Sequence, residues 1–426
     1  MESEEGQRRV RARRARCAAR AAIGCIALCM CALAGARGPA FSGMYANAND
    51  AAEAADNPAA LTRIKDPEWM GEVMAFTSPS TDVVSGTIGS VSATTSVDNT
   101  NNLAIPGLYY ARPLNDRLGF GASLTVPSGV GSDPGSASVG RYLLEKWSLA
   151  YASLAPAVGY RVNEKFSIGV APQINYSFYD YKTAVFNGPG LADGTMELSG
   201  GAFGFGYRIG FLYEFSPQTR LALTYRSATT SKFDGTPDLS GLTPQREAIL
   251  QAAGVRNANV NMETRFPQMV GAGVYHEFAN GASASFDGQW IDFEQFGMTE
   301  LSLNNTSLTT NNGRYQGIWA GTAGFNWPIN ERWTAQFGAV YASSGVSDQN
   351  RTFGLRLDRI WGFGAGATYR WGRDKTIAAN LDYYNLGPAP VTASIPGIGS
   401  LYAEYSSNYA IGIQVSFRWQ NLRDGR

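Results

Sequence analysis

The stretch Asn408–Trp419 reads NYAIGIQVSFRW and carries the clearest structural pattern in the chain. Large apolar residues fill every second position, and small or polar residues fill the positions between them. Successive side chains of a β-strand point to opposite faces, so one face of this segment is apolar and the other is not. The segment is longer than an average strand of a soluble sheet, and it is about long enough to cross a bilayer at a tilt. The pattern predicts the closing strand of a transmembrane β-barrel.

The composition of the 426-residue chain fits the same class. It has 49 glycines, 12% aromatic residues and only 16% charged residues, and its mean hydropathy is −0.18. A helical membrane protein would contain several apolar runs of about 20 residues, and the sequence has none of that length. Large barrels form single domains, so the length does not require several domains.

The amino terminus has the layout of a secretory signal peptide. Seven arginines precede or enter the apolar run Ala21–Ala36, which ends in the small residues Ala34-Gly35-Ala36. This order predicts cleavage after Ala36, with an uncleaved membrane anchor as the less favoured alternative because the run is short. All four cysteines lie within residues 17–31, so the mature chain is expected to lack disulfides and thiol chemistry. Loss of seven arginines and three glutamates leaves 28 basic and 32 acidic residues, a net charge of −4 that predicts no nucleic-acid partner.

The rest of the chain divides into three parts. Arg37–Pro67 shows no strand alternation and is predicted to be an amino-terminal hatch, inside or beneath the barrel. Residues 68–419 contain fourteen strand-like segments, and residues 420–426 are predicted to be a tail. Short turns lie near residues 113–116, 162–165, 216–219, 279–281, 330–332 and 372–375. Longer loops lie near 78–104, 127–145, 182–194, 234–260, 297–314, 345–354 and 388–401. Six short turns alternating with seven long loops predict an all-β, fourteen-stranded antiparallel up-and-down barrel rather than a soluble sandwich.

Four motifs, taken in this order and spacing, resemble the FadL-type long-chain fatty-acid and hydrocarbon transporters of Gram-negative outer membranes. They are Asn57-Pro58-Ala59, the block Ala111–Ser123 (ARPLNDRLGFGAS), the block Phe203–Ser227 and the element Asp358-Arg359-Ile360-Trp361. The resemblance covers nearly all of the mature chain, although the hatch is shorter than in the family.

The resemblance implies a barrel whose lumen is plugged by the hatch, with Asn57, Pro58 and Ala59 as gating residues. Outer loops would capture a hydrophobic ligand, pass it to an internal apolar pocket and release it sideways beside a kinked third strand. Four residues of that strand tolerate a kink and are the candidates for the lateral opening: Gly119, Gly121, Pro127 and Gly129.

The family's cationic residues that meet a ligand carboxylate do not align clearly with this chain. Inward-facing arginines are the candidates here: Arg208, Arg226 and Arg359. The alternative is an ordinary interior ion pair, such as Arg208 with Glu214 or with an acidic residue of the hatch, because barrel interiors commonly carry paired charges.

The function predicted is passive transport of a hydrophobic small molecule, most plausibly a long-chain fatty acid, in the Gram-negative outer membrane. The chain is expected to be a monomer in contact with outer-membrane lipid, without enzyme activity, cofactor or metal. His276 is the single histidine, which excludes a site with two imidazole ligands. Two alternatives remain, a general diffusion porin for polar solutes and an outer-membrane lipid hydrolase that would have to use His276.

Overall fold

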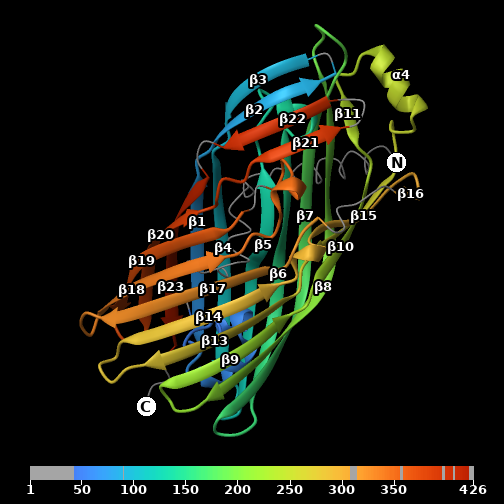
Figure 1. Cartoon of the computed structure of the whole chain (residues 1–426). Coiled ribbons are helices and arrows are strands. Elements are labelled where there is room, and N and C mark those ends of the chain that lie inside the picture. The colour runs from blue at the N-terminus through green and yellow to red at the C-terminus, as the bar shows by residue number, and fades with distance from the viewer. Residues whose placement is uncertain are drawn as a thin grey trace.

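The computed structural model describes residues 43–89, 91–307, 314–355, 358–395, 399–405 and 408–421 (Figure 1). The predicted signal peptide, residues 37–42 of the predicted hatch and residues 422–426 of the predicted tail lie outside the described residues. Within those ranges, no helix combines the length and apolar character that a membrane crossing requires.

Fourteen antiparallel strands form the wall of a closed barrel. They are β1 (Glu68–Ser78), β4 (Asn101–Pro113), β5 (Leu118–Ser132), β6 (Lys146–Arg161), β7 (Phe166–Val185), β8 (Gly194–Glu214), β9 (Thr219–Arg226), β13 (Met269–Glu277), β14 (Ser283–Ile291), β17 (Ile318–Pro328), β18 (Trp333–Ala342), β19 (Ile360–Trp371), β20 (Lys375–Asn385) and β23 (Tyr409–Gln420). Each pairs with its neighbours in the chain, and the first and last close the circle from Glu68↔Gln420 to Thr77↔Ile411. The predicted strand number and order are confirmed, and β23 runs one residue beyond the predicted end at Trp419.

The wall has the two faces that the alternation predicts. In β23, Ile413 is 54% exposed on the outer face, whereas Gln414 beside it is 1% exposed inside. Closure leaves neither the first nor the last strand of the wall with a free edge, and this matters because hydrocarbon offers no hydrogen bonds to an unpaired backbone. The outer face is therefore suited to lipid and the inner face to a hatch or a ligand.

The long loops build a second layer at one end of the barrel. One four-stranded sheet contains β10 (Thr229–Gly235), β12 (Val260–Phe266), β15 (Gly297–Leu303) and β16 (Thr306–Ser307); another contains β2 (Thr81–Ile88), β3 (Val91–Asp98), β21 (Val391–Ile395) and β22 (Gly399–Tyr405). The short strand β11 (Asp238–Ser240) pairs with β8, and the loops also hold α4 (Pro244–Ala252) and the 3₁₀ turns η3 (Val139–Tyr142), η4 (Phe293–Gln295) and η5 (Asp348–Asn350). Figure 1 shows β2, β3, β21, β22 and α4 at the end opposite to the short turns.

The hatch, as described here, is residues 43–67 and contains α3 (Glu53–Asp56) and the 3₁₀ helix η2 (Pro58–Arg63). It packs against the inner faces of one side of the wall, β4 to β8. Ala54, Leu61, Ala155, Ala157 and Ala171 share one buried apolar cluster. The small alanines of the wall let the hatch backbone approach the strands closely.

Candidate functional site

Asn57 fixes the hatch at its centre. Its side chain is fully buried; Nδ2 donates to the carbonyl oxygens of Tyr45 at 2.8 Å and Phe211 at 3.3 Å, while Oδ1 accepts from the Ala59 N–H at 3.1 Å. The last bond caps η2, and Pro58 occupies its first turn, where a missing N–H costs nothing. One side chain therefore joins two parts of the hatch to each other and to β8.

Glycines of the wall leave room for this segment. A Cβ at Gly210 would come within 2.0 Å of Asn57 Oδ1, and one at Gly169 within 2.3 Å of the Pro58 carbonyl carbon. Gly119 and Gly121 on β5 have the same environment, because a Cβ there would meet the backbone of Leu61 or the side chain of Ala54. The structure thus places two of the four lateral-opening candidates under the hatch.

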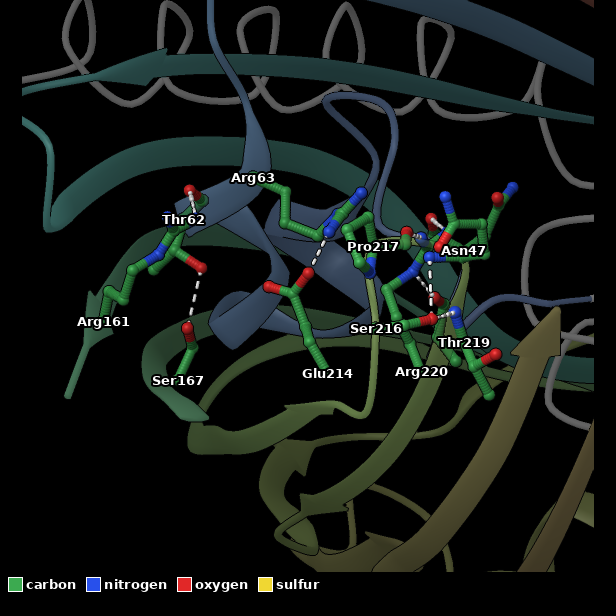
Figure 2. A network of polar contacts seen from close by, with 12 residues as sticks. Asn47, Thr62, Arg63, Arg161, Ser167, Glu214, Ser216, Pro217, Thr219 and Arg220 are labelled. Carbon is green, nitrogen blue, oxygen red and sulfur yellow. Dashed lines mark hydrogen bonds and ion pairs between the residues drawn. The ribbon is translucent and has the colours of Figure 1, made fainter. Parts of the chain in front are cut away.

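Arginines tie the hatch to the wall near the short-turn end (Figure 2). Arg220 donates to the carbonyl oxygens of Ala46 at 2.9 Å and Asn47 at 2.8 Å, and Arg161 donates to that of Thr62 at 2.7 Å. Arg63 of the hatch pairs with Glu214 of β8. Glu214 is therefore held by the hatch rather than by Arg208, which was the alternative partner expected from the sequence.

The third wall strand, β5, is interrupted. Its pairing with β4 ends at Leu108↔Leu124, so the later residues of β5 have no partner on β4. Its pairing with β6 shifts by one residue between Thr125 and Ser128, which places Pro127 in the irregular step. Such a bulge bends a strand, and proline lacks the N–H that a ladder needs. Pro127 lies in this break, and Gly129 follows it opposite Ala150.

A cavity lies between the hatch and the wall, beside this break. The hatch contributes Met44, Tyr45, Ala55 and Asp56, and the wall contributes Tyr109, Ser123, Thr125, Pro127, Ser153, Gln173, Arg208, Arg226 and Met269. Two predicted arginines come together here, because Arg208 of β8 and Arg226 of β9 are direct cross-strand partners. Both are buried, at 6% and 4% exposure.

The two arginines carry more donors than the protein uses. Arg208 Nη1 donates to the Asp56 carbonyl oxygen at 2.8 Å, but its Nε has no hydrogen-bond partner. Within the described part of the chain, no hydrogen bond or ion pair is found for the Arg226 guanidinium. Burial raises the pKa of the nearby Tyr45 phenol, which stays protonated and donates to Gln289 Oε1 at 2.9 Å. Two adjacent buried cations with spare donors are suited to an anion.

A chain of aromatic side chains leads from the outer loops toward this cavity. Tyr315 contacts Phe293 with ring centroids 5.5 Å apart, and Phe293 stacks on Phe296 at 4.5 Å. Phe296 contacts Phe266 at 6.1 Å, and Phe266 contacts Tyr151 at 4.5 Å. These residues belong to one buried apolar cluster that also contains Met269 of the cavity. Buried apolar side chains are thus in contact from the outer loops to Met269 of the cavity.

Arg359 and His276 lie elsewhere. Arg359 is exposed, just before β19, and does not line the cavity. His276 lies on β13, where its Nδ1 shares a hydrogen bond of 2.8 Å with the Thr219 hydroxyl. Within the described ranges, no group of three His, Cys, Asp or Glu residues is placed to hold a metal ion.

Sequence reasoning did not single out Tyr45, Met269, Ser123, Ser153 or Gln173. The last three are polar residues at inward positions of alternating strands, a pattern that they share with many lumen residues. Alternation identifies the face of the wall but not the height along the barrel, so it could not group them with Arg208.

Comparison with known proteins agrees with this geometry. The family model described as outer membrane protein transport protein (OMPP1/FadL/TodX) matches residues 15–419. A long-chain fatty acid transport protein of Salmonella typhi is 26% identical over 371 residues, which cover 81% of this chain and 84% of that protein. The protein of the same name from Escherichia coli strain K12 is 26% identical over 383 residues, with the same coverage.

Solved structures share the fold. The crystal structure of a Pseudomonas aeruginosa FadL homologue matches with a TM-score of 0.81 at 17% identity, covering 91% of this chain and 98% of that one. The toluene transporter TodX of Pseudomonas putida matches with a TM-score of 0.63 at 16% identity, covering 94% and 99%. The names of these relatives include both fatty-acid and toluene transporters, so the likeness alone does not decide between the two ligands.

Proposed function

The chain belongs to the outer membrane transport protein family OMPP1/FadL/TodX, whose members carry hydrophobic compounds, and from this premise we propose that it transports long-chain fatty acids. The observation that carries the proposal is the pair Arg208 and Arg226, buried side by side in the cavity. The ligand carboxylate binds between the two guanidinium groups.

The arginines favour an acid over a neutral hydrocarbon. Removing a charge from water without a partner is costly, and two like charges side by side add repulsion. A bound carboxylate offsets both the cost of removing the charges from water and the repulsion between them. It also accepts charge-assisted hydrogen bonds from the arginine N–H groups that have no partner in the protein. Asp56 of the hatch lines the same cavity and offsets part of this charge, but two arginines face one carboxylate there. An aromatic hydrocarbon offers no acceptor for the spare donors of Arg208 and Arg226.

Entry begins on the outer sheet formed by β10, β12 and β15. A second cavity there is lined by the apolar residues Phe233, Met262 and Leu301 and by charged residues: Lys232, which pairs with Glu263, together with Asp234 and Glu300. Phe233 and Met262 belong to the same buried cluster as the aromatic chain, with Leu301 packed against it. An alkyl chain captured here keeps an apolar surface at each step inward, and no step requires it to enter water.

Release occurs sideways through the wall at the break in β5. The ladder between β4 and β5 stops beside Thr125 and Pro127, and both residues line the cavity. Lateral release delivers the alkyl chain into hydrocarbon and avoids the polar short-turn end of the lumen.

The test compares an acid with its uncharged analogue. Arg226→Met removes the charge but keeps a long, unbranched side chain. Uptake of labelled oleate should fall roughly tenfold or more in this variant, because a hydrogen bond to a charged group contributes about 1.5–3 kcal/mol. Uptake of oleyl alcohol changes little. The matched control is Arg359→Met, an exposed arginine outside the cavity, which keeps oleate uptake. Equal loss of acid and alcohol uptake in Arg226→Met, or no loss of either, would overturn the carboxylate assignment.

A further inference from the structure

The cavity has two chemically different sides. The arginines lie on β8 and β9, and Asp56 of the hatch is the third charged residue of the lining. The strands β5, β6 and β7 contribute Pro127 and four neutral polar residues: Ser123, Thr125, Ser153 and Gln173. All four are buried, with exposures of 2%, 6%, 1% and 5% respectively. A carboxylate held by the arginines accounts for the charged side and leaves the neutral side unexplained.

The neutral side lacks hydrogen-bond partners. Ser123 Oγ, Ser153 Oγ and Gln173 Oε1 are fully buried, and none of the three is hydrogen-bonded. An unsatisfied buried polar group costs about 1–3 kcal/mol, and native proteins nearly always satisfy such groups with protein, ligand or water. Three of them facing one cavity indicate that its occupant brings polar atoms to this side.

A carboxylate alone does not meet this need. An ionised carboxylate only accepts hydrogen bonds, whereas the Gln173 amide has both an oxygen that accepts and an NH₂ group that donates. If the Gln173 amide is flipped, so that its oxygen and nitrogen exchange places, it still needs both a donor and an acceptor from the ligand. A hydroxyl group donates and accepts at once, and it is complementary to serine hydroxyls and to an amide in either orientation.

We propose that Ser123, Ser153 and Gln173 form a hydroxyl subsite beside Arg208 and Arg226, so that the preferred cargo is a long-chain fatty acid with a hydroxyl group on carbon 2 or 3. This inference rests on the proposed function, because the carboxylate at the arginines sets the position of the hydroxyl.

The strand register places the two subsites next to each other. Ala171 of β7 is the direct partner of Arg208 on β8, and Gln173 lies two residues further along the same inner face. Such diagonal neighbours are roughly 7–8 Å apart at the backbone. Ser153 is the direct partner of Asn175 on β7 and of Thr125 on β5, one inner-face step beyond Gln173. A hydroxyl near the carboxylate can reach this side, whereas one at the far end of the alkyl chain cannot.

The experiment measures competition with labelled palmitate for the full-length protein purified in detergent. Three competitors are compared: palmitate, 3-hydroxypalmitate and 16-hydroxypalmitate, the last with the same atoms as the second but its hydroxyl at the far end. We expect 3-hydroxypalmitate to bind roughly tenfold more tightly than palmitate, as one or two additional hydrogen bonds predict. We expect 16-hydroxypalmitate to show no such gain.

Two variants locate the effect. Gln173→Leu removes the amide and should lower the affinity for 3-hydroxypalmitate to that for palmitate. Gln336→Leu, on the inner face of β18 outside this cavity, is the control and should keep the tenfold preference.

Each outcome separates this inference from the proposed function. Equal binding of palmitate and 3-hydroxypalmitate, or a preference that survives Gln173→Leu, would mean that water satisfies the neutral side and would overturn the hydroxyl subsite. Failure of all three acids to compete would instead overturn the carboxylate site and the proposed function with it.

Discussion

Glycines occupy the wall positions where the hatch backbone approaches most closely. Gly169 and Gly210 face the backbone of Pro58 and the side chain of Asn57, at distances where a Cβ would overlap those atoms. Gly288 of β14, by comparison, has open space around the position of a Cβ. Glycine at the first two positions is thus a packing requirement of the hatch and not a property of the strand.

Gly169→Val is expected to push η2 off the wall, because overpacking a tight contact costs about 1–3 kcal/mol and the hatch is the more movable partner. Single-channel conductance in planar bilayers should rise above that of the unaltered protein as the plug loosens. Gly288→Val adds the same side chain to the same barrel without touching the hatch and should leave conductance at the original level. If conductance rises in both variants, or in neither, the close contact at Gly169 does not hold the hatch in place.

Strand β5 has two distinct parts: glycines in its first half contact the hatch, and a register shift interrupts its pairing with β6 further along. Gly119 and Gly121 pair regularly with β6, and the register shifts only after Thr125. The bend of the third strand therefore lies at Val126 and Pro127, and the two glycines earlier in the strand serve the hatch contact. Whether Gly119 and Gly121 also assist opening stays a prediction.

Deleting Pro127 gives β5 the same number of residues as the facing part of β6 and restores one continuous register. The hydrogen-bonded pairing of β5 with its neighbours can then continue past this point and close the exit. Oleate uptake should fall roughly tenfold or more, whereas palmitate binding in detergent should persist because the cavity remains. Pro127→Ala is the matched control: it restores the N–H but keeps the additional residue, so the bulge and most of the uptake should remain. Unchanged uptake after the deletion would argue against release at this break.

The molecule as a whole depends on joining its two ends. β1 and β23 pair from Glu68↔Gln420 to Thr77↔Ile411, and this pairing closes the fourteen strands into a barrel. Without it, β1 and β23 would each expose unpaired backbone groups to hydrocarbon, at several kcal/mol for each group. Closure is therefore a condition for insertion in the membrane.

A chain ending at Asn408 lacks β23 and should give no folded, heat-modifiable band on an unboiled electrophoresis gel. A chain ending at Asn421 keeps all of β23 and should fold as the full-length protein does. A folded band from the shorter chain would mean that β1 and β20 can pair directly, and fourteen strands would then not be essential.

Much of this architecture can be predicted from the sequence because it depends on local sequence patterns. Alternation along Tyr409–Trp419 identifies the face toward lipid, and the contrast between short turns and long loops identifies the strand count and the two ends. The Asn57-Pro58-Ala59 motif and two of the three predicted inward arginines, Arg208 and Arg226, are also visible in the linear chain, whereas Arg359 is exposed. A strand's side chains have a period of two regardless of their neighbours, so these features need no tertiary contact.

The height of a residue along the barrel axis cannot be predicted in this way, because it depends on how far each strand is shifted relative to its neighbour. Register alone makes Arg208 a direct partner of Arg226, leaves Arg359 outside, and sets Gln173 beside the arginines. Register also puts the break in β5 next to the cavity, at Pro127, one of the four kink candidates, and away from Gly119 and Gly121. Periodicity is a property of one strand. A binding site requires residues of seven strands and the hatch to lie at the same height along the barrel, and only the closed, packed barrel settles that height.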